Sequence, residues 1–309
     1  MLTDLKWELY RQMKSIRRVE ETLLDLFDEG KLHGTVHTCI GQEACAVGII
    51  NALDQQKDII WSNHRGHGHY LAYSDDIEGL MAEIMGRANG VCGGVGGSQH
   101  LHRDGFYTNG VLGGTVACAV GTALAEKHKE SRAITTVFFG DGALGEGVIY
   151  ESFNLASLWN LPVLFVLEHN RYAQSTPSHQ EHAGNLALRA APFEIESKEL
   201  HANDVMVVAQ VAAEAAQKVR QQQRPFFLVL HTERFAPHSK GDDFRPPEEM
   251  AERRKEDPLK RLRSTLAEIN IQQLEALEAS IEQRITKSIE SAQDCPPMTA
   301  DAFIQKARS

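Results

Sequence analysis

The sequence predicts an α/β protein with a doubly wound parallel sheet and helical extensions at both ends. Apolar runs of the length of buried strands cover residues 134–139, 163–167 and 225–230. Helical patterns separate these runs, as expected for helices on both faces of a parallel sheet. We expect one α/β domain at residues 1–245 and a helical extension at residues 246–309.

The N-terminal helix is predicted at residues 3–29, where apolar residues recur at intervals of three and four, and Gly30 ends it. A second helix is predicted from Gly41 to Leu53 and begins with Gly-Gln-Glu-Ala. The helix dipole favours an acid such as Glu43 in a first turn. A direct catalytic role for Glu43 is an equally good interpretation.

A short predicted strand at residues 59–62 leads into Asn-His-Arg-Gly-His-Gly-His. Its three histidines invite a zinc interpretation, but no cysteine or carboxylate nearby completes a ligand set. Arg65 is more informative, because a guanidinium beyond a strand end suits bidentate binding of a diphosphate. On their own, His67 is typical of a hydrogen-bonded structural histidine and His69 of a surface one.

A glycine-rich stretch at residues 90–100 is predicted to be a flexible loop. It lacks the strict G-x-G-x-x-G spacing after a strand, so we reject a dinucleotide site. Residues 109–114 then precede a helix of small residues at 115–128. Small side chains on a helix permit close packing of another backbone.

The central unit is a strand, a Gly140-Asp141-Gly142 turn, a helix and a second strand that ends in Glu168-His169-Asn170. In a parallel sheet, ligands bind beyond the carboxyl ends of the strands. If the two strands are neighbours, the oxygens of Asp141 and Asn170 converge there, and hard oxygens suit magnesium. The glycines allow a phosphate to approach the backbone, and the helix N-terminus favours its charge.

Beyond this unit, the polar residues 175–185 are predicted to form a mobile loop, and a helix is predicted at residues 204–220 with Asn203-Asp204 as its cap. The strand at 225–230 leads into a polar loop that runs to Arg245. The charged C-terminal helices carry no catalytic signature, and their apolar stripes are expected to pack on the domain or on a partner subunit.

Composition excludes several classes of protein. The chain of 309 residues has 42% hydrophobic and 24% charged residues and a net charge of −10. Such a charge gives no reason to expect nucleic acid or an anionic membrane as partner, and no apolar run has the length of a membrane span. The N-terminus lacks the pattern of a signal peptide, and the five cysteines form no metal-type pairs. We expect a cytoplasmic protein with reduced thiols.

The segment from Gly140 to Thr176, GDGALGEGVIYESFNLASLWNLPVLFVLEHNRYAQST, resembles the thiamine diphosphate fingerprint. The wider sequence is similar, over nearly the whole chain, to the alpha subunit of the decarboxylating component of 2-oxoacid dehydrogenase complexes and of acetoin dehydrogenase. The resemblance implies the diphosphate-binding domain of the thiamine diphosphate-binding fold. At His169, where the family usually has Asn, and at His64, where an aromatic residue is usual, this chain departs from the family pattern.

The resemblance also implies site residues. Magnesium is expected to bind the side chains of Asp141 and Asn170 and the backbone carbonyl of Tyr172. His238, on a loop that closes over the cofactor and becomes ordered when it binds, is the main catalytic candidate, with His67 and His100 as further candidates. The expected cofactor-binding residues are Arg65 and His64 near the diphosphate, Gly110 and Leu112 at the pyrimidine, Gly140, Asp141, Gly142, Ala143, Asn170, Tyr172 and His238.

As activity, the resemblance implies magnesium- and thiamine diphosphate-dependent decarboxylation of a 2-oxoacid, or cleavage of acetoin, with transfer to a lipoyl carrier. A beta subunit is expected to supply the pyrimidine-binding domain and the activating glutamate in an α2β2 assembly, and a lipoyl acyltransferase is a further candidate partner. The alternatives are a stand-alone acyloin-forming or transketolase-like enzyme, or a non-catalytic subunit that keeps the fold. An ATP-binding protein is disfavoured, because no Gly-Lys-Ser/Thr motif is present. We expect no phosphorylation of Ser239.

Overall fold

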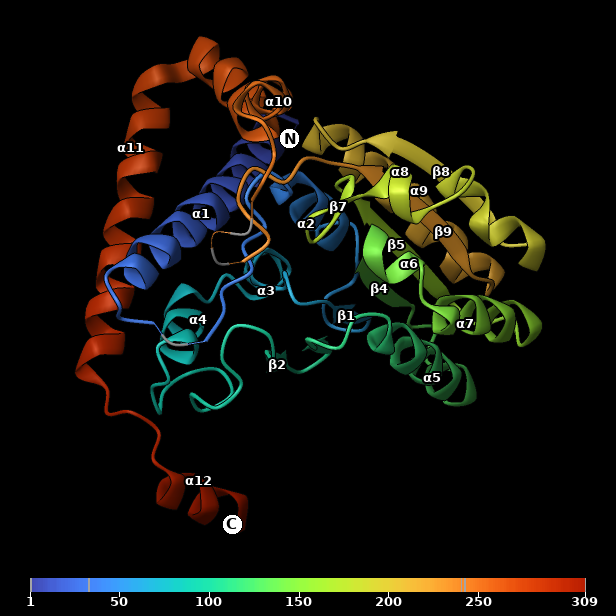
Figure 1. The fold of residues 1–309 in the computed structure, drawn as a ribbon, viewed down its shortest axis with the longest axis horizontal. Coiled ribbons are helices and arrows are strands. Elements are labelled where there is room, and N and C mark those ends of the chain that lie inside the picture. The colour runs from blue at the N-terminus through green and yellow to red at the C-terminus, as the bar shows by residue number, and fades with distance from the viewer. Residues whose placement is uncertain (1, 33, 240, 242, 309) are drawn as a thin grey trace.

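The computed structural model describes residues 2–32, 34–239, 241 and 243–308. It has one principal sheet with helices on both faces (Figure 1). None of the helices in these ranges is long and apolar enough to cross a membrane.

The strands of the principal sheet follow the order β2-β3-β1-β4-β5-β9-β8, and all adjacent pairs are parallel except β2–β3. This confirms the predicted parallel sheet. β4 pairs directly with β5, with Gly140 opposite Glu168, as the predicted convergence of the two strand ends requires. The strands are β1 (Ile59–Ser62), β2 (His102–Arg103), β3 (Phe106–Thr108), β4 (Thr135–Gly140), β5 (Val163–His169), β8 (Glu196–His201) and β9 (Phe226–His231).

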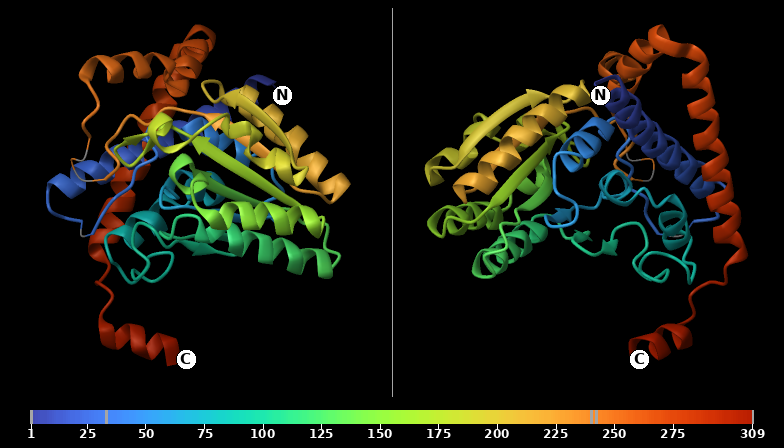
Figure 2. Two further views of the ribbon diagram at one scale, coloured as in Figure 1. Left: turned by 45° about the vertical axis from the view of Figure 1, so that its right-hand side comes forward. Right: turned by 180° about the vertical axis from the view of Figure 1, so that it is seen from behind.

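Alternate residues of the central strands face opposite layers of helices. Phe138 and Leu164 belong to a core that includes residues of α1 (Leu2–Asp28), α2 (Glu43–Ile50) and α9 (Val205–Gln222). Phe139 and Phe165 belong to a second core with α5 (Gly114–His128) and α7 (Gly147–Leu158). Figure 2 shows the two layers from other sides. Burial on both faces explains why these strands read as continuous apolar runs.

The C-terminal part packs on the domain mainly through α11 (Pro258–Asp294), which lies along α1 and α4 (Ile77–Ile84). Leu266, Leu274, Ile281 and Ile285 of α11 are buried in the same core as α1. The charged region that was predicted to be helical contains α10 (Pro247–Arg253), a 3₁₀ turn, Arg254–Glu256, and α11, which has a kink at Asn270. After α11 lies α12 (Ala300–Arg308), which extends away from the body of the molecule (Figure 1).

Several local predictions were wrong. The Gly-Asp-Gly segment is a short helix, α6 (Asp141–Leu144), rather than a turn, and α2 is shorter than predicted. Residues 175–185 do not form an irregular loop, because they contain β7 (Thr176–Pro177), which pairs with β6 (Tyr172–Ala173), and α8 (Ser178–Glu181). The 3₁₀ helix Leu186–Phe193 and the strands β2, β3 and β8 were missed, as was α3 (His67–Ser74), which begins inside the histidine-rich segment. β8 is an outer strand with mostly exposed side chains, so it has no apolar signal.

The predicted cap of α9 gives a first test. The side chain of Asp204 accepts a hydrogen bond from the backbone N–H of Met206 at 2.9 Å, which satisfies one of the unpaired donors of the first turn. We expect Asp204→Ala to lower the free energy of unfolding by about 1 kcal/mol in urea denaturation. Asn203→Ala is the matched control, since Asn203 contacts Glu256 at an exposed position and caps nothing. Equal losses in the two variants would contradict the cap.

Candidate functional site

A cavity of about 270 Å³ lies beyond the carboxyl ends of β1, β4 and β5. Besides the ends of these strands, the cavity is lined by the residue before α2, the loop before α5, the β6 segment, α8 and the loop after β9. The strand order makes this meeting possible, because parallel neighbours end at one edge of the sheet. The lining residues are Gln42, Asn63, His64, Arg65, Leu112, Gly140, Asp141, Gly142, Ala143, Glu168, Asn170, Tyr172, Ala173, Gln174, Glu181 and His238.

Asp141 is the most informative of these residues. Its side chain is 2% exposed, and Oδ1 accepts a hydrogen bond from the N–H of Gly142 at 3.1 Å. Oδ2 is buried and has no hydrogen-bond partner in the described part of the chain. Burial raises the pKa of this carboxyl to about 6. A buried carboxylate oxygen without a donor is costly unless a cation occupies the space beside it, so this position fits a metal ion.

The raised pKa predicts how stability depends on pH in the absence of metal. Asp141 has a pKa of about 6 in the folded chain against an ordinary value of 3.8 for an aspartate, so the folded state holds its proton more tightly. Stability from this group is therefore complete below pH 4 and is lost as the pH rises through 6. We expect metal-free Asp141→Asn to be more stable than the wild type by roughly 3 kcal/mol at pH 8 and equal to it at pH 4. Urea denaturation across this range tests it, and a constant difference would contradict it.

Asn170 and Tyr172 line the same cavity as Asp141. The side chain of Asn170 accepts from the N–H of Tyr172 at 3.1 Å and donates to Oε1 of Gln42 at 3.2 Å. These two hydrogen bonds orient the side-chain amide of Asn170, with its oxygen toward the β6 segment and its nitrogen toward Gln42. Gln42 was not predicted as a site residue, although it lies in the Gly-Gln-Glu-Ala segment. A carboxylate and a carbonyl-type oxygen held this way are the ligands that magnesium prefers.

In the Gly140-Asp141-Gly142 segment, the position that has no room for a side chain is Gly142. A Cβ at this position would lie 2.9 Å from Cβ of Ala173 in β6, so the two segments approach too closely for any side chain. This close approach brings the backbone at the start of α6 to the cavity.

Arg65 and His238 contact each other at the opposite wall. Nη2 of Arg65 lies 3.0 Å from Nδ1 of His238, and its Nη1 donates to the carbonyl of Thr38 at 2.7 Å. A guanidinium only donates, so Nδ1 accepts and the neutral ring of His238 carries its proton on Nε2. The rings of His37 and His64 lie 4.8 and 5.5 Å from that of His238.

His64 is the least satisfied of the three histidines. Both of its ring nitrogens are buried without a hydrogen-bond partner among the described residues. Burial, with Arg65 and the other two histidines, holds its pKa well below the usual value, so the ring is neutral. Such a ring offers one donor and one acceptor to a bound molecule.

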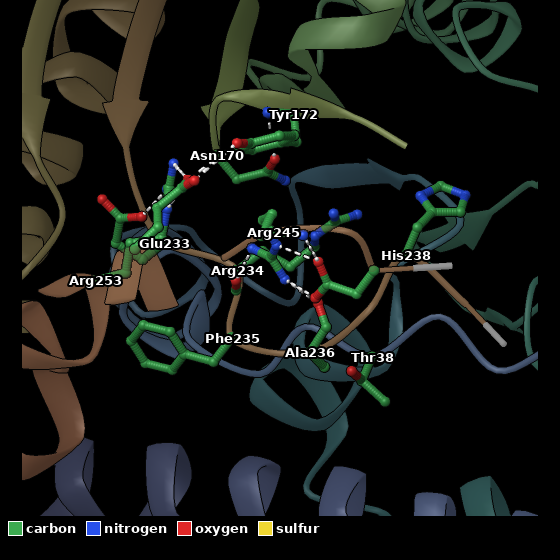
Figure 3. A network of polar contacts seen from close by, with 12 residues as sticks. Thr38, Asn170, Tyr172, Glu233, Arg234, Phe235, Ala236, His238, Arg245 and Arg253 are labelled. Carbon is green, nitrogen blue, oxygen red and sulfur yellow. Dashed lines mark hydrogen bonds and ion pairs between the residues drawn. The ribbon is translucent and has the colours of Figure 1, made fainter. Parts of the chain in front are cut away.

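The loop that carries His238 is held from within by Arg245. This arginine donates to the carbonyl of Ala236 at 2.8 Å and to that of Arg234, and its guanidinium lies over the ring of Tyr172 (Figure 3). The Tyr172 hydroxyl in turn donates to Glu249 at 3.0 Å. The loop is thus packed against the cavity, while its predicted ordering by cofactor remains a prediction. Residues 240 and 242 of the predicted loop lie outside the described part.

A buried polar group at the base of the cavity was missed. Glu168 is 3% exposed, lies 3.4 Å from Nε2 of His69 and accepts from the side chain of Asn63 at 3.4 Å. His69 was predicted to be a surface residue, which is wrong: it is 1% exposed, and its Nδ1 lies 2.8 Å from Oγ of Ser62. The position of Glu168 directly after an apolar strand was the signal that could have identified it.

The structure brings together all the predicted site residues except Gly110, His67 and His100, which do not line the cavity. His67 is buried between Glu20 and Ser98, as expected for a structural histidine. Leu112 does line the cavity, and at 44% exposure it is not a core residue. Gly110 lies on the same loop as Leu112, beside the side chain of Gln99.

His169 takes part in a chain of contacts. Nδ1 lies 3.1 Å from Nδ1 of His231, and Nε2 lies 3.1 Å from Oγ of Ser178 and 3.6 Å from Oδ2 of Asp141. Burial, with His231 and Arg171, lowers the pKa of His169 to about 4. The ring is therefore neutral at neutral pH and does not supply a positive charge to Asp141.

The sequence of this chain is similar to those of several known proteins. Residues 11–301 match the model of the dehydrogenase E1 component family. The chain is 36% identical over 296 residues to the alpha subunit of acetoin:2,6-dichlorophenolindophenol oxidoreductase of Bacillus subtilis, covering 93% of this chain and 89% of that protein. It is 36% identical over 299 residues to the pyruvate dehydrogenase E1 component subunit alpha of Zymomonas mobilis, covering 94% and 84%. To the alpha subunit of the acetoin oxidoreductase of Cupriavidus necator it is 40% identical over 238 residues, covering 76% and 71%.

Proposed function

Since the chain belongs to the dehydrogenase E1 component family, we propose that it is the alpha subunit of a thiamine diphosphate- and magnesium-dependent oxidoreductase that decarboxylates a 2-oxoacid or cleaves acetoin. The observation that carries this proposal is the buried Oδ2 of Asp141, which has no hydrogen-bond partner among the described residues and lies in the cavity that Asn170 also lines. The α/β domain at residues 1–245 holds the site, and the helical extension at residues 246–309 packs on this domain through α11.

We assign the metal to the side chains of Asp141 and Asn170 and the backbone carbonyl of Tyr172. Arg65 and His64 are suited to the diphosphate, because one is a buried guanidinium and the other a neutral ring with unmet hydrogen-bonding capacity. Gly140, Gly142 and Ala143 bring their backbone to the same end of the cavity. Leu112, exposed at the cavity edge, is placed to support the pyrimidine together with Gly110.

Thiamine diphosphate, when bound, supplies a carbon nucleophile and an electron sink for cleavage next to a carbonyl. The residues of this chain hold the cofactor in position and supply a proton to the substrate. Nδ1 of His238 accepts from Arg65, so the proton on Nε2 is the one available to a substrate oxygen. The hydrogen bond from Arg245 to the carbonyl of Ala236 holds the segment that carries His238 in place at the cavity.

The relatives are alpha subunits of multi-subunit enzymes, and this chain is expected to need a beta subunit. The partner would supply the pyrimidine-binding domain and the activating glutamate. We propose that the two subunits form an α2β2 assembly. A lipoyl acyltransferase would accept the acyl unit.

Calorimetric titration of thiamine diphosphate with magnesium tests it. The titration is made into the chain alone and into the chain co-expressed with a beta-like subunit encoded next to it. Tight binding only in the co-expressed sample, followed by turnover of a 2-oxoacid or acetoin, would support the split site. Failure to bind in either sample would overturn the catalytic proposal and leave a non-catalytic subunit.

A further inference from the structure

A buried carboxylate lies at the centre of the glycine-rich loop. Glu83, in α4, is 0% exposed, and its two oxygens accept four backbone hydrogen bonds. The donors are the N–H groups of Cys92 at 2.7 Å, Gly94 at 2.8 Å, Gly96 at 2.7 Å and Gly97 at 3.1 Å. Several convergent N–H donors are what a buried carboxylate needs to remain charged.

The path of the loop around the carboxylate explains its glycines. A Cβ at Gly90 would lie 2.5 Å from Oε2 of Glu83, and one at Gly96 would lie 2.0 Å from the carbonyl oxygen of His100. Gly94 and Gly97 have φ values of +77° and +59°, which side chains rarely adopt. The loop that was rejected as a dinucleotide site therefore wraps around an anion of its own chain.

The end of the loop contacts the groups behind the cavity. Nε2 of Gln99 lies 2.9 Å from Nδ1 of His37, and the His37 ring meets those of His64 and His238 at 5.1 and 4.8 Å. Oε1 of Gln99 also lies beside Gly110, at 2.3 Å from where a Cβ would be. The loop is thus connected through Gln99 and His37 to His64 and His238, which line the cavity.

Resting on the function proposed above, we propose that Glu83 is a positioning residue for the reaction. It fixes the loop so that Gln99 holds His37, and His37 holds the rings of His64 and His238 in place. Asp141 and Asn170 are held instead by the ends of β4 and β5. Loss of Glu83 should therefore disturb the position of His238 more than it disturbs metal binding at Asp141 and Asn170.

The test uses the complex with its beta subunit and the variants Glu83→Gln and Glu83→Ala. Gln keeps the size of the side chain but replaces one acceptor oxygen by a donor. In both variants we expect faster amide exchange of residues 92–97. Since small displacements of reacting groups are costly, we expect a fall in kcat of about 10-fold or more. The calorimetric affinity for thiamine diphosphate with magnesium should fall less than kcat does, because the assigned metal ligands stay in place and, of the residues assigned to the diphosphate, only His64 is reached through His37.

Glu126→Gln is the matched control, because Glu126 is 8% exposed and pairs with Lys129 near the end of α5, away from the loop. It should leave all three quantities unchanged. Faster exchange with unchanged kcat, or equal losses in kcat and cofactor affinity, would reduce Glu83 to a structural role and overturn the inference. A wild-type complex that binds no cofactor would instead overturn the proposed function. Shifts of the His37 and His238 ring resonances in the Glu83 variants would still test Glu83 in that case.

Discussion

Asp141→Ala is expected to abolish magnesium-dependent binding of thiamine diphosphate. The variant removes the buried oxygen that has no hydrogen-bond partner among the described residues, and with it one of the two side-chain ligands that we assign to the metal. Loss of a carboxylate ligand should raise the dissociation constant by about 100-fold or more, since even supporting residues of metal sites are worth 10- to 100-fold. Calorimetry on the complex, with magnesium held constant, measures it.

The control for this variant is Glu151→Gln. Glu151 is an exposed residue of α7 that does not line the cavity. It should keep the wild-type affinity to within about 2-fold, as expected of a surface substitution outside the site. Wild-type affinity in Asp141→Ala would place the metal elsewhere and remove the main support for the proposed function.

Glu43→Ala is expected to destabilise the fold by about 3–5 kcal/mol, the cost of breaking a buried ion pair from one side. Glu43 is 0% exposed, pairs with Arg17 in α1 and accepts from the N–H of Gly41 at 3.0 Å. Arg17 also pairs with Asp257, the N-cap of α11, at 3.1 Å. The variant would leave the buried guanidinium with half of its partners. Urea denaturation measures the loss.

This variant also separates the two interpretations of Glu43. Glu43 does not line the cavity, so cofactor affinity, measured at a temperature where the variant is folded, should stay within about 2-fold of the wild type. Glu8→Ala is the control for stability, because its pair with Arg11 is half exposed and should contribute less than about 1 kcal/mol. A large loss of cofactor affinity in Glu43→Ala at normal stability would favour a direct role.

The sequence was sufficient for the parts of the fold that carry a strong apolar pattern. β4, α7 and β5 were predicted because both strands are buried on two faces, and α1 because its apolar stripe is long. β2 and β3 have two and three residues, too few for any periodicity. The short helix at Asp141 was missed because glycines on both sides indicate a turn, whereas packing against β6 decides the conformation.

The site divides in the same way. Asp141, Arg65 and Asn170 were predictable because each lies within three residues of a strand end, and parallel strands bring such positions together. The contact of His37 with His64 and His238 was not predictable, since three distant segments meet only in the fold. The burial of His69 against Glu168 belongs to the same class.

The polar outer strand β8 has a consequence for solubility. An outer strand presents unpaired backbone groups that invite a strand of another molecule to add to the sheet. Glu196, Lys198 and Glu199 give this strand charges along its length, and Lys198 and Glu196 form ion pairs with Glu214 and Lys218 of α9. Addition of a foreign strand there would force these charges out of water. The same polarity that concealed β8 from sequence patterns thus protects the sheet from edge-to-edge aggregation.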